Sequence, residues 1–239
     1  MILEANNKTL EYKLADPDNQ EHIGQASLQE REGFGTGVDP QELPEILQFI
    51  ARNGHVWLQY AVEGAERTPT GVFETLPLEE ALKFDPSRIV TQYDISRSPL
   101  RVITSNQDNA FRDARRFAND PDILYHHGIS MSRRNLGYGT LLLNHGLNNT
   151  PGLRDKVVIC FIDAAQLDEG GQLKPAANES SYTLHMKAGF VLAGVVEPPV
   201  YDDKISYYPV IRPKDSKPLD FTSQKEILRF DVADVGDTI

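Results

Sequence analysis

The most informative segment of the chain reads Ile129-Ser130-Met131-Ser132-Arg133-Arg134-Asn135-Leu136-Gly137-Tyr138-Gly139-Thr140. An apolar strand pattern over residues 123–131 leads into it, and a helical pattern over residues 139–147 follows it. A strand, tight loop and helix in this order direct several backbone N–H groups at one point, and the helix N-terminus adds partial positive charge. The two glycines let the main chain approach an anion closely, because no Cβ stands in the way. The segment therefore predicts a site for an anionic ligand, in particular a pyrophosphate.

The loop differs from two other phosphate-binding loops. It lacks the Gly-Lys-Ser/Thr of a Walker loop and the Gly-x-Gly-x-x-Gly spacing of a dinucleotide-binding fold. It belongs to a locally basic window over residues 97–134, in which the arginines are Arg97, Arg101, Arg112, Arg115, Arg116, Arg133 and Arg134. The last two would supply charge at the rim of the site. The window favours an anionic ligand, although a solvated helix would also explain the three arginines in its middle.

A second segment lies downstream of an apolar run over residues 156–163. It reads Asn178-Glu179-Ser180-Ser181-Tyr182-Thr183-Leu184-His185-Met186-Lys187-Ala188-Gly189-Phe190. We expect a helix over residues 179–188 that ends at Gly189. On such a helix Asn178, Ser181 and His185 share one face.

These two segments resemble conserved motifs of the GNAT N-acetyltransferase family. Residues 134–139 resemble motif A, Arg/Gln-x-x-Gly-x-Gly/Ala, and residues 178–190 resemble motif B, Asn-x-x-Ala/Ser-x-x-Leu-Tyr-x-Lys-x-Gly-Phe. The motifs occur in the family's order, and the resemblance spans residues 123–210. It implies an α/β fold, with a central mixed sheet of about six to seven strands flanked by helices on both faces.

The resemblance also implies the ligands and the reaction. Acetyl-CoA would be the co-substrate, without a metal, and its acetyl group would pass by direct attack to a primary amine of a small-molecule or amino-acid-like acceptor. A backbone N–H near Ile129 to Met131 would stabilise the oxyanion. The residues implied in cofactor binding are Ile129, Met131, Arg134, Asn135, Leu136, Gly137, Tyr138, Gly139, Thr140, Asn178 and Ser181. A catalytically silent acyl-CoA-binding module and a binder of another nucleotide are the alternatives.

Three residues are candidates for catalysis: His185, Glu74 and His127. His185 stands where most family members have the tyrosine that protonates the departing thiolate, and it is similar to the branch that acetylates amino acids and phosphinothricin-like compounds. A packing role for this histidine is equally open. Glu74 and His127, with His126, are candidates for the base that takes the ammonium proton. Strand alternation places His127 on the same face as Ile129 and His126 on the other.

The composition limits the classes of partner and the cellular compartment that we expect for this protein. A formal net charge of -11 argues against nucleic-acid binding, and it either favours a cationic acceptor or serves solubility alone. No apolar run approaches the roughly 20 residues of a membrane helix, and the N-terminus lacks a signal-peptide core. The single cysteine, Cys160, lies in an apolar run and is expected to be buried. We therefore expect a cytoplasmic protein without a membrane partner.

The chain divides into three parts by pattern. Residues 1–38 are polar and are expected to form an irregular or wrapped N-terminal extension, which could include a short strand over residues 10–14. Residues 39–213 are expected to form the GNAT domain and residues 214–239 a tail. Strands over 56–62 and 70–76 are expected to form a hairpin. Residues 77–120 resemble an insertion that could form a lid or a dimer surface, so a homodimer is one possibility for the oligomeric state.

Overall fold

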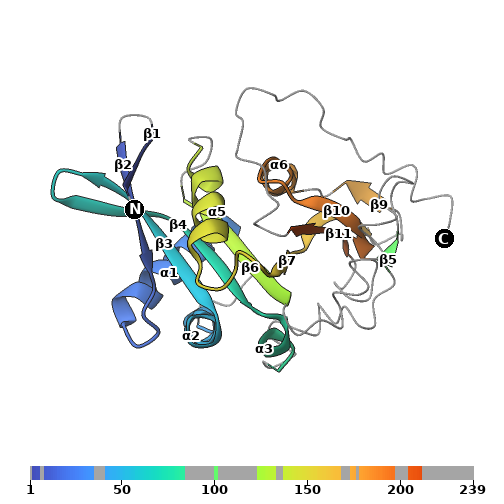
Figure 1. Ribbon diagram of the computed structural model, residues 1–239, viewed down its shortest axis with the longest axis horizontal. Helices are drawn as coiled ribbons and strands as arrows, with labels where there is room; N and C mark the ends of the chain where they lie inside the picture. The colour runs from blue at the N-terminus through green and yellow to red at the C-terminus, as the bar shows by residue number, and fades with distance from the viewer. Residues whose placement is uncertain are drawn as a thin grey trace.

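The computed structural model describes residues 2–5, 8–34, 41–83, 100–101, 123–132, 137–167, 173–175, 178–196 and 204–211. Helices and strands alternate through most of this length (Figure 1). The helices are α1 (Gln20–Phe34), α2 (Leu43–Asn53), α3 (Leu78–Lys83), α5 (Tyr138–Asn149) and α6 (Glu179–Lys187). The strands are β1 (Ile2–Ala5), β2 (Lys8–Leu14), β3 (His55–Glu63), β4 (Glu66–Pro77), β5 (Leu100–Arg101), β6 (Ile123–Met131), β7 (Val157–Ile159), β8 (Ile162–Leu167), β9 (Leu173–Pro175), β10 (Val191–Val196) and β11 (Lys204–Ile211).

All of these strands join in one mixed sheet. Its order is β1-β2-β3-β4-β6-β7-β11-β10-β5, and β8 and β9 extend from β11. The pairing of β6 with β7 is parallel, as expected for strands joined through helix α5, and β10 and β11 pair antiparallel. The α/β class with a mixed sheet is confirmed. The described sheet has 11 strands rather than six or seven, because short strands pair at both ends.

Helices cover both faces of the sheet (Figure 1). On one face, the apolar side chains of α1, α2 and α3 pack against those of β3, β4 and β6. On the other face, α5 packs against β4 and β6, and α6 contributes Tyr182 to the same apolar cluster. Buried residues alternate along the strands between these two clusters, as the two-residue period of a strand requires. Val72 belongs to the first cluster and Phe73 to the second.

The N-terminal segment is part of the fold, contrary to the expectation of an irregular extension. Strand β2 pairs antiparallel with β3 along its whole length, from Thr9↔Val62 to Leu14↔Trp57. Helix α1 buries Ile23 and Ala26 in the core. The helical spacing of these residues was overlooked because polar residues surround them. The domain boundaries stay a prediction.

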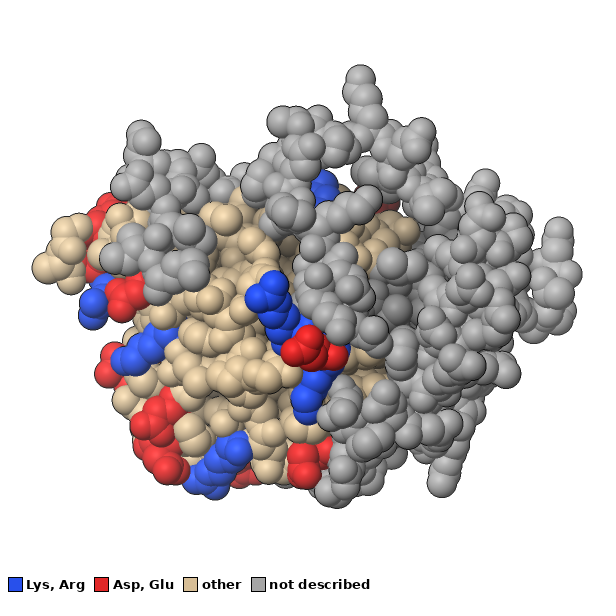
Figure 2. Space-filling model, in the orientation of Figure 1, with Lys and Arg blue, Asp and Glu red and all other residues tan. Residues whose placement is uncertain are grey.

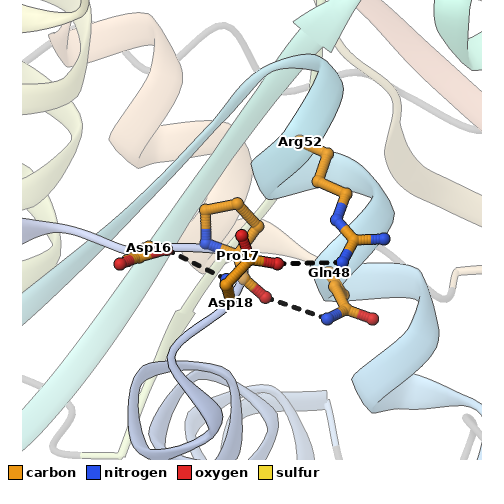
Figure 3. Close-up of polar contacts among 5 residues, drawn as sticks. All are labelled: Asp16, Pro17, Asp18, Gln48 and Arg52. Atoms are coloured by element: carbon orange, nitrogen blue, oxygen red, sulfur yellow. Dashed lines mark hydrogen bonds and ion pairs between the residues drawn. The ribbon is translucent and has the colours of Figure 1, made fainter.

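The turn between β2 and α1 is fixed by polar contacts (Figure 3). The Asp18 backbone N–H donates to Asp16 Oδ1 at 2.9 Å. From α2, Gln48 Nε2 donates to the Pro17 carbonyl at 2.9 Å, and Arg52 Nη2 lies 3.0 Å from Asp18 Oδ1. These contacts hold the start of α1 against α2.

Several local expectations are confirmed. Strands β3 and β4 form the predicted hairpin, and β6 occupies the expected residues. The strand expected over residues 156–163 is instead divided into β7 and β8, which pair with different parts of β11. Cys160, between them, is buried. Most of the insertion-like stretch 77–120 and the whole tail 214–239 lie outside the described residues.

Candidate functional site

A β-bulge interrupts the central strand β6. Its pairing with β4 is Glu74↔Gly128 on one side of the bulge and Thr75↔His126 on the other, so His127 is the extra residue. As a result, His127 contacts Glu74 on the α1 face, whereas Ile129 packs into the cluster on the α5 face. The expectation that His127 and Ile129 share a face was wrong, because strict alternation fails across a bulge.

Strands β6 and β7 separate just before the bulge. Their parallel pairing runs from Ile123↔Val157 to Tyr125↔Ile159, although β6 continues to Met131. We call this edge of β6, from residue 126 to residue 131, the wedge; it pairs with none of the described strands. At its far end the Ser132 N–H donates to the Thr70 carbonyl of β4 at 3.1 Å. Because consecutive strand residues direct their amides to opposite edges, Met131 and Ile129 direct theirs into the wedge.

Helix α5 begins at the same end of β6. Gly137 precedes it with φ 76°, a left-handed conformation that favours glycine, and no side chain caps the helix. A Cβ added at Gly139 would lie 3.4 Å from Met131 Cγ and 3.8 Å from Leu184 Cδ2, so α5, β6 and α6 meet here. The Tyr138 side chain is buried in the core and offers only its backbone to a ligand. Arg134, Asn135 and Leu136 lie outside the described residues.

Helix α6 places His185 beside the start of the wedge. Asn178 is its N-cap, and the Asn178 Oδ1 accepts from the Ser181 N–H at 3.0 Å. Imidazole Nδ1 of His185 lies 2.7 Å from the Ser181 carbonyl, which can only accept, so this nitrogen carries the proton. The His185 ring lies 5.3 Å from that of His126.

His185 and His126 are both neutral near pH 7. Burial lowers the pKa of His185 to about 4 and that of His126 to about 3. Imidazole Nδ1 of His126 donates to the Glu74 carbonyl at 2.8 Å. The Nε2 of His185 is buried and has no hydrogen-bond partner within the described structure. In this tautomer Nε2 is an acceptor, so the geometry does not favour the proton-donating role expected of His185.

Glu74 and His127 form a hydrogen-bonded pair on the α1 face. Glu74 Oε2 lies 2.7 Å from His127 Nδ1, and the side chains are 0% and 21% exposed respectively. Burial raises the pKa of Glu74 to about 7 and lowers that of His127. Carboxylate side chains on strands commonly face solvent, but that of Glu74 does not. It is a buried partner for a partly exposed histidine.

The structure thus divides the three predicted catalytic residues between the two faces of the sheet. Glu74 and His127 lie together, whereas His185 lies across the sheet beside His126. Sequence reasoning missed Glu30 of α1, which is 4% exposed and lies beside Glu74. A charged residue at helical spacing from Ile23 and Ala26 was the signal that could have revealed it.

The surface shows no concentration of one charge over the described part of the face in Figure 2, where acidic and basic side chains are interspersed. None of the described helices has the length and apolarity that crossing a bilayer requires. Within the described ranges, no three His, Cys, Asp or Glu side chains are grouped so that they could hold a metal ion.

Comparison with known proteins gives a likeness in structure alone. No protein-family profile matches the chain, and its sequence matches no curated protein. An aminoglycoside 6'-N-acetyltransferase complexed with coenzyme A superposes with a TM-score of 0.50 and 14% identity, over 84% of this chain and 96% of that one. A candidate acetyltransferase from Acinetobacter baylyi gives 0.50 and 12% identity, over 86% and 93%. At this level of identity the likeness concerns the fold, and the chain has the fold of the GNAT acetyltransferases that its two motifs resemble.

Proposed function

We propose that the protein is an acetyl-CoA-dependent N-acetyltransferase that acetylates a primary amine of a small-molecule or amino-acid-like acceptor. The observation that carries the proposal is the wedge, where β6 runs on without β7 beside the uncapped start of α5. Fold alone does not determine function. Here the two GNAT-like motifs and the opened strand edge meet at one point of the fold, which is the arrangement that a thioester co-substrate needs.

The residues at the wedge fit coenzyme A in two respects. The first N–H groups of α5 have no intrahelical partners and would bind the pyrophosphate. Among the described residues, no atom lies within 4 Å of a Cβ added at Gly137, so none of them blocks the approach. The amides of Ile129 and Met131 would bind the thioester arm or the oxyanion that forms at its carbonyl. The roles of Arg134, Asn135 and Leu136 remain sequence-based expectations.

The pair on the α1 face supplies a proton acceptor. With Glu74 ionised, His127 donates Nδ1–H to it and keeps a lone pair on Nε2. His127 would take a proton from the acceptor ammonium, and the freed amine would attack the acetyl carbonyl. The C–N bond then forms and the C–S bond breaks, and the proton that the attacking nitrogen loses passes through solvent to the departing thiolate. Cys160 takes no part, because it is buried and its thiol pKa is raised by burial.

The test is release of free thiol from acetyl-CoA with a panel of amines, compared with matched reactions without amine. Amine-dependent thiol release, lowered at least 10-fold by His127→Gln, is the expected result, since general base catalysis contributes about 10²–10⁴-fold. A second candidate, a silent acyl-CoA-binding module, is favoured by His185, which replaces the usual tyrosine. Thermal stabilisation by coenzyme A without thiol release from any amine would support the module instead.

A further inference from the structure

Helix α1 packs its main chain directly on strand β6 beside the Glu74–His127 pair. A Cβ added at Gly33 would lie 2.7 Å from Ser130 Cβ and 2.9 Å from Ser130 Oγ, so only a glycine fits there. Glu30 lies three residues earlier and therefore on the same side of the helix. The close approach at Gly33 brings the Glu30 carboxyl into the interior, next to Glu74.

Two carboxyl groups and an imidazole thus share one buried cluster, drawn from three elements. Glu30 comes from α1, Glu74 from β4 and His127 from β6, with Ser130 beside Glu30. Glu30 Oε1 and Glu74 Oε1 are both buried, and neither has a hydrogen-bond partner within the described structure. Two adjacent buried carboxyl groups do not both ionise near neutral pH, and a proton between them satisfies both.

The proton belongs on Glu30. Burial and the neighbouring Glu74 charge raise the pKa of Glu30 well above its usual range, whereas that of Glu74 rises only to about 7. The 2.7 Å contact with His127 also favours this arrangement, because an ionised Glu74 accepts more strongly from the His127 Nδ1–H than a protonated one does. No other titratable group is known to influence Glu74 or Glu30 among the described residues.

We infer that Glu30 is a positioning residue for the proposed reaction. As a neutral acid it donates a hydrogen bond to Glu74. The ionised Glu74 in turn holds His127 in the tautomer whose Nε2 accepts a proton. This inference rests on the proposed function for its catalytic consequence. The arrangement itself is a property of the protein without substrate. It can therefore be tested separately.

The test compares two substitutions that differ in one property. Glu30→Gln keeps a neutral donor, whereas Glu30→Met keeps the volume and removes the donor. Glu32→Gln, at an exposed position of the same helix, is the control. Loss of the donor raises the pKa of Glu74, so a higher pH is needed to ionise it. We expect the acidic limb of kcat/KM to move up by roughly one pH unit in Glu30→Met and to stay in place in Glu30→Gln.

A second readout does not depend on activity. Nitrogen-15 NMR of the imidazoles, assigned with His127→Gln, reports which ring nitrogen of His127 is protonated. We expect the Nδ1–H tautomer at pH 7 in the wild type and in Glu30→Gln, and a shift toward Nε2–H in Glu30→Met. A purely structural Glu30 would leave both the tautomer and the pH limb unchanged in Glu30→Met, and that result overturns the inference.

The two proposals fail in different ways. Wild-type His127 protonated at Nε2 at pH 7 overturns the role of Glu30, whatever the enzyme does. The expected tautomers without thiol release from any amine leave the cluster intact and overturn the proposed acetyl transfer. If Glu30→Met does not fold, the wild-type tautomer and the behaviour of Glu30→Gln still decide the question.

Discussion

Gly146 of α5 lies against the ring of Phe73 in β4, and an added methyl group has no room there. A Cβ at Gly146 would stand 2.4 Å from Phe73 Cδ1 and Cε1 and 2.8 Å from Cζ. Nonbonded carbons settle at about 3.5–4.0 Å, so ring or helix must move by roughly 1 Å. The ring cannot withdraw easily, because Phe73 is 0% exposed and stacks on His126 at 4.6 Å.

Two effects of opposite sign determine the stability of Gly146→Ala. Alanine improves helix propensity by about 1 kcal/mol. Overpacking of a filled core costs about 1–3 kcal/mol, and an overlap with three ring atoms belongs at the upper end of that range. We expect a net loss of about 1–2 kcal/mol in the free energy of unfolding.

Gly24→Ala is the matched control, because it makes the same change in α1. Gly24 is exposed, and no atom of the described residues lies within 4 Å of its added Cβ. Only the propensity term applies there, so this variant should gain about 0.5–1 kcal/mol. Urea unfolding followed by circular dichroism measures both midpoints at an unchanged slope. A Gly146→Ala protein as stable as the wild type, alongside a stabilised Gly24→Ala, would refute the packing of α5 on β4 described above.

Three further predictions concern the wedge and its histidines. Gly137→Ala should cost about 1–2 kcal/mol of stability for its left-handed conformation, and calorimetric titration should show weaker binding of coenzyme A; unchanged affinity would count against a pyrophosphate at the start of α5. His185→Phe should leave turnover in the thiol assay and affinity for coenzyme A near normal, because the proposed mechanism gives the buried Nε2 no proton to transfer; a clear loss of turnover at normal affinity would assign His185 a catalytic role. The pKa values of His126 and His185, about 3 and about 4 against a usual 6.5, mean that both gain protons on unfolding, so the stability present above pH 6.5 should be lost as the pH falls toward 4. The raised pKa of Glu74 acts in the opposite sense over the same range, so the loss is measured as the difference in urea midpoint between the wild type and His185→Phe from pH 4 to 7. A difference that does not change with pH would contradict the burial of His185 as a neutral ring.

The sequence predicted those parts of the fold that carry a periodic pattern or a cap signal. Strand β6 and helix α6 were placed closely, and Gly189, with φ 96°, ends α6 in the expected left-handed conformation. Helix α1 was missed, although Asn19 stands at its start and its Oδ1 accepts from the backbone N–H groups of Glu21 and His22. Its buried face carries Ser27 and Glu30 among the apolar residues, which weakens the hydrophobic period that identifies a helix.

The candidate site could be predicted only where residue type and chain order suffice. The glycine loop and the motif B helix lie within short segments of the chain, so their spacing is visible in the sequence. The partnership of Glu74, His127 and Glu30 joins three distant segments, and it depends on how closely α1 approaches β6 at Gly33. Such an approach follows from packing and has no local signal. His127 was identified as a candidate, but its face was assigned by an alternation that the bulge breaks.

The bulge at His127 resolves two demands that a regular strand could not meet together. The side chain of Met131 must face α5, where its Cγ would lie 3.4 Å from a Cβ at Gly139, so that it packs the start of α5 against the sheet. His127 must face α1 to reach Glu74. In a regular strand, residues 127 and 131 point to the same face, and one of the two contacts would be lost. One extra residue on β6 reverses the alternation between residues 127 and 131. A single strand therefore holds the proposed proton acceptor on one face and contacts the start of α5 on the other.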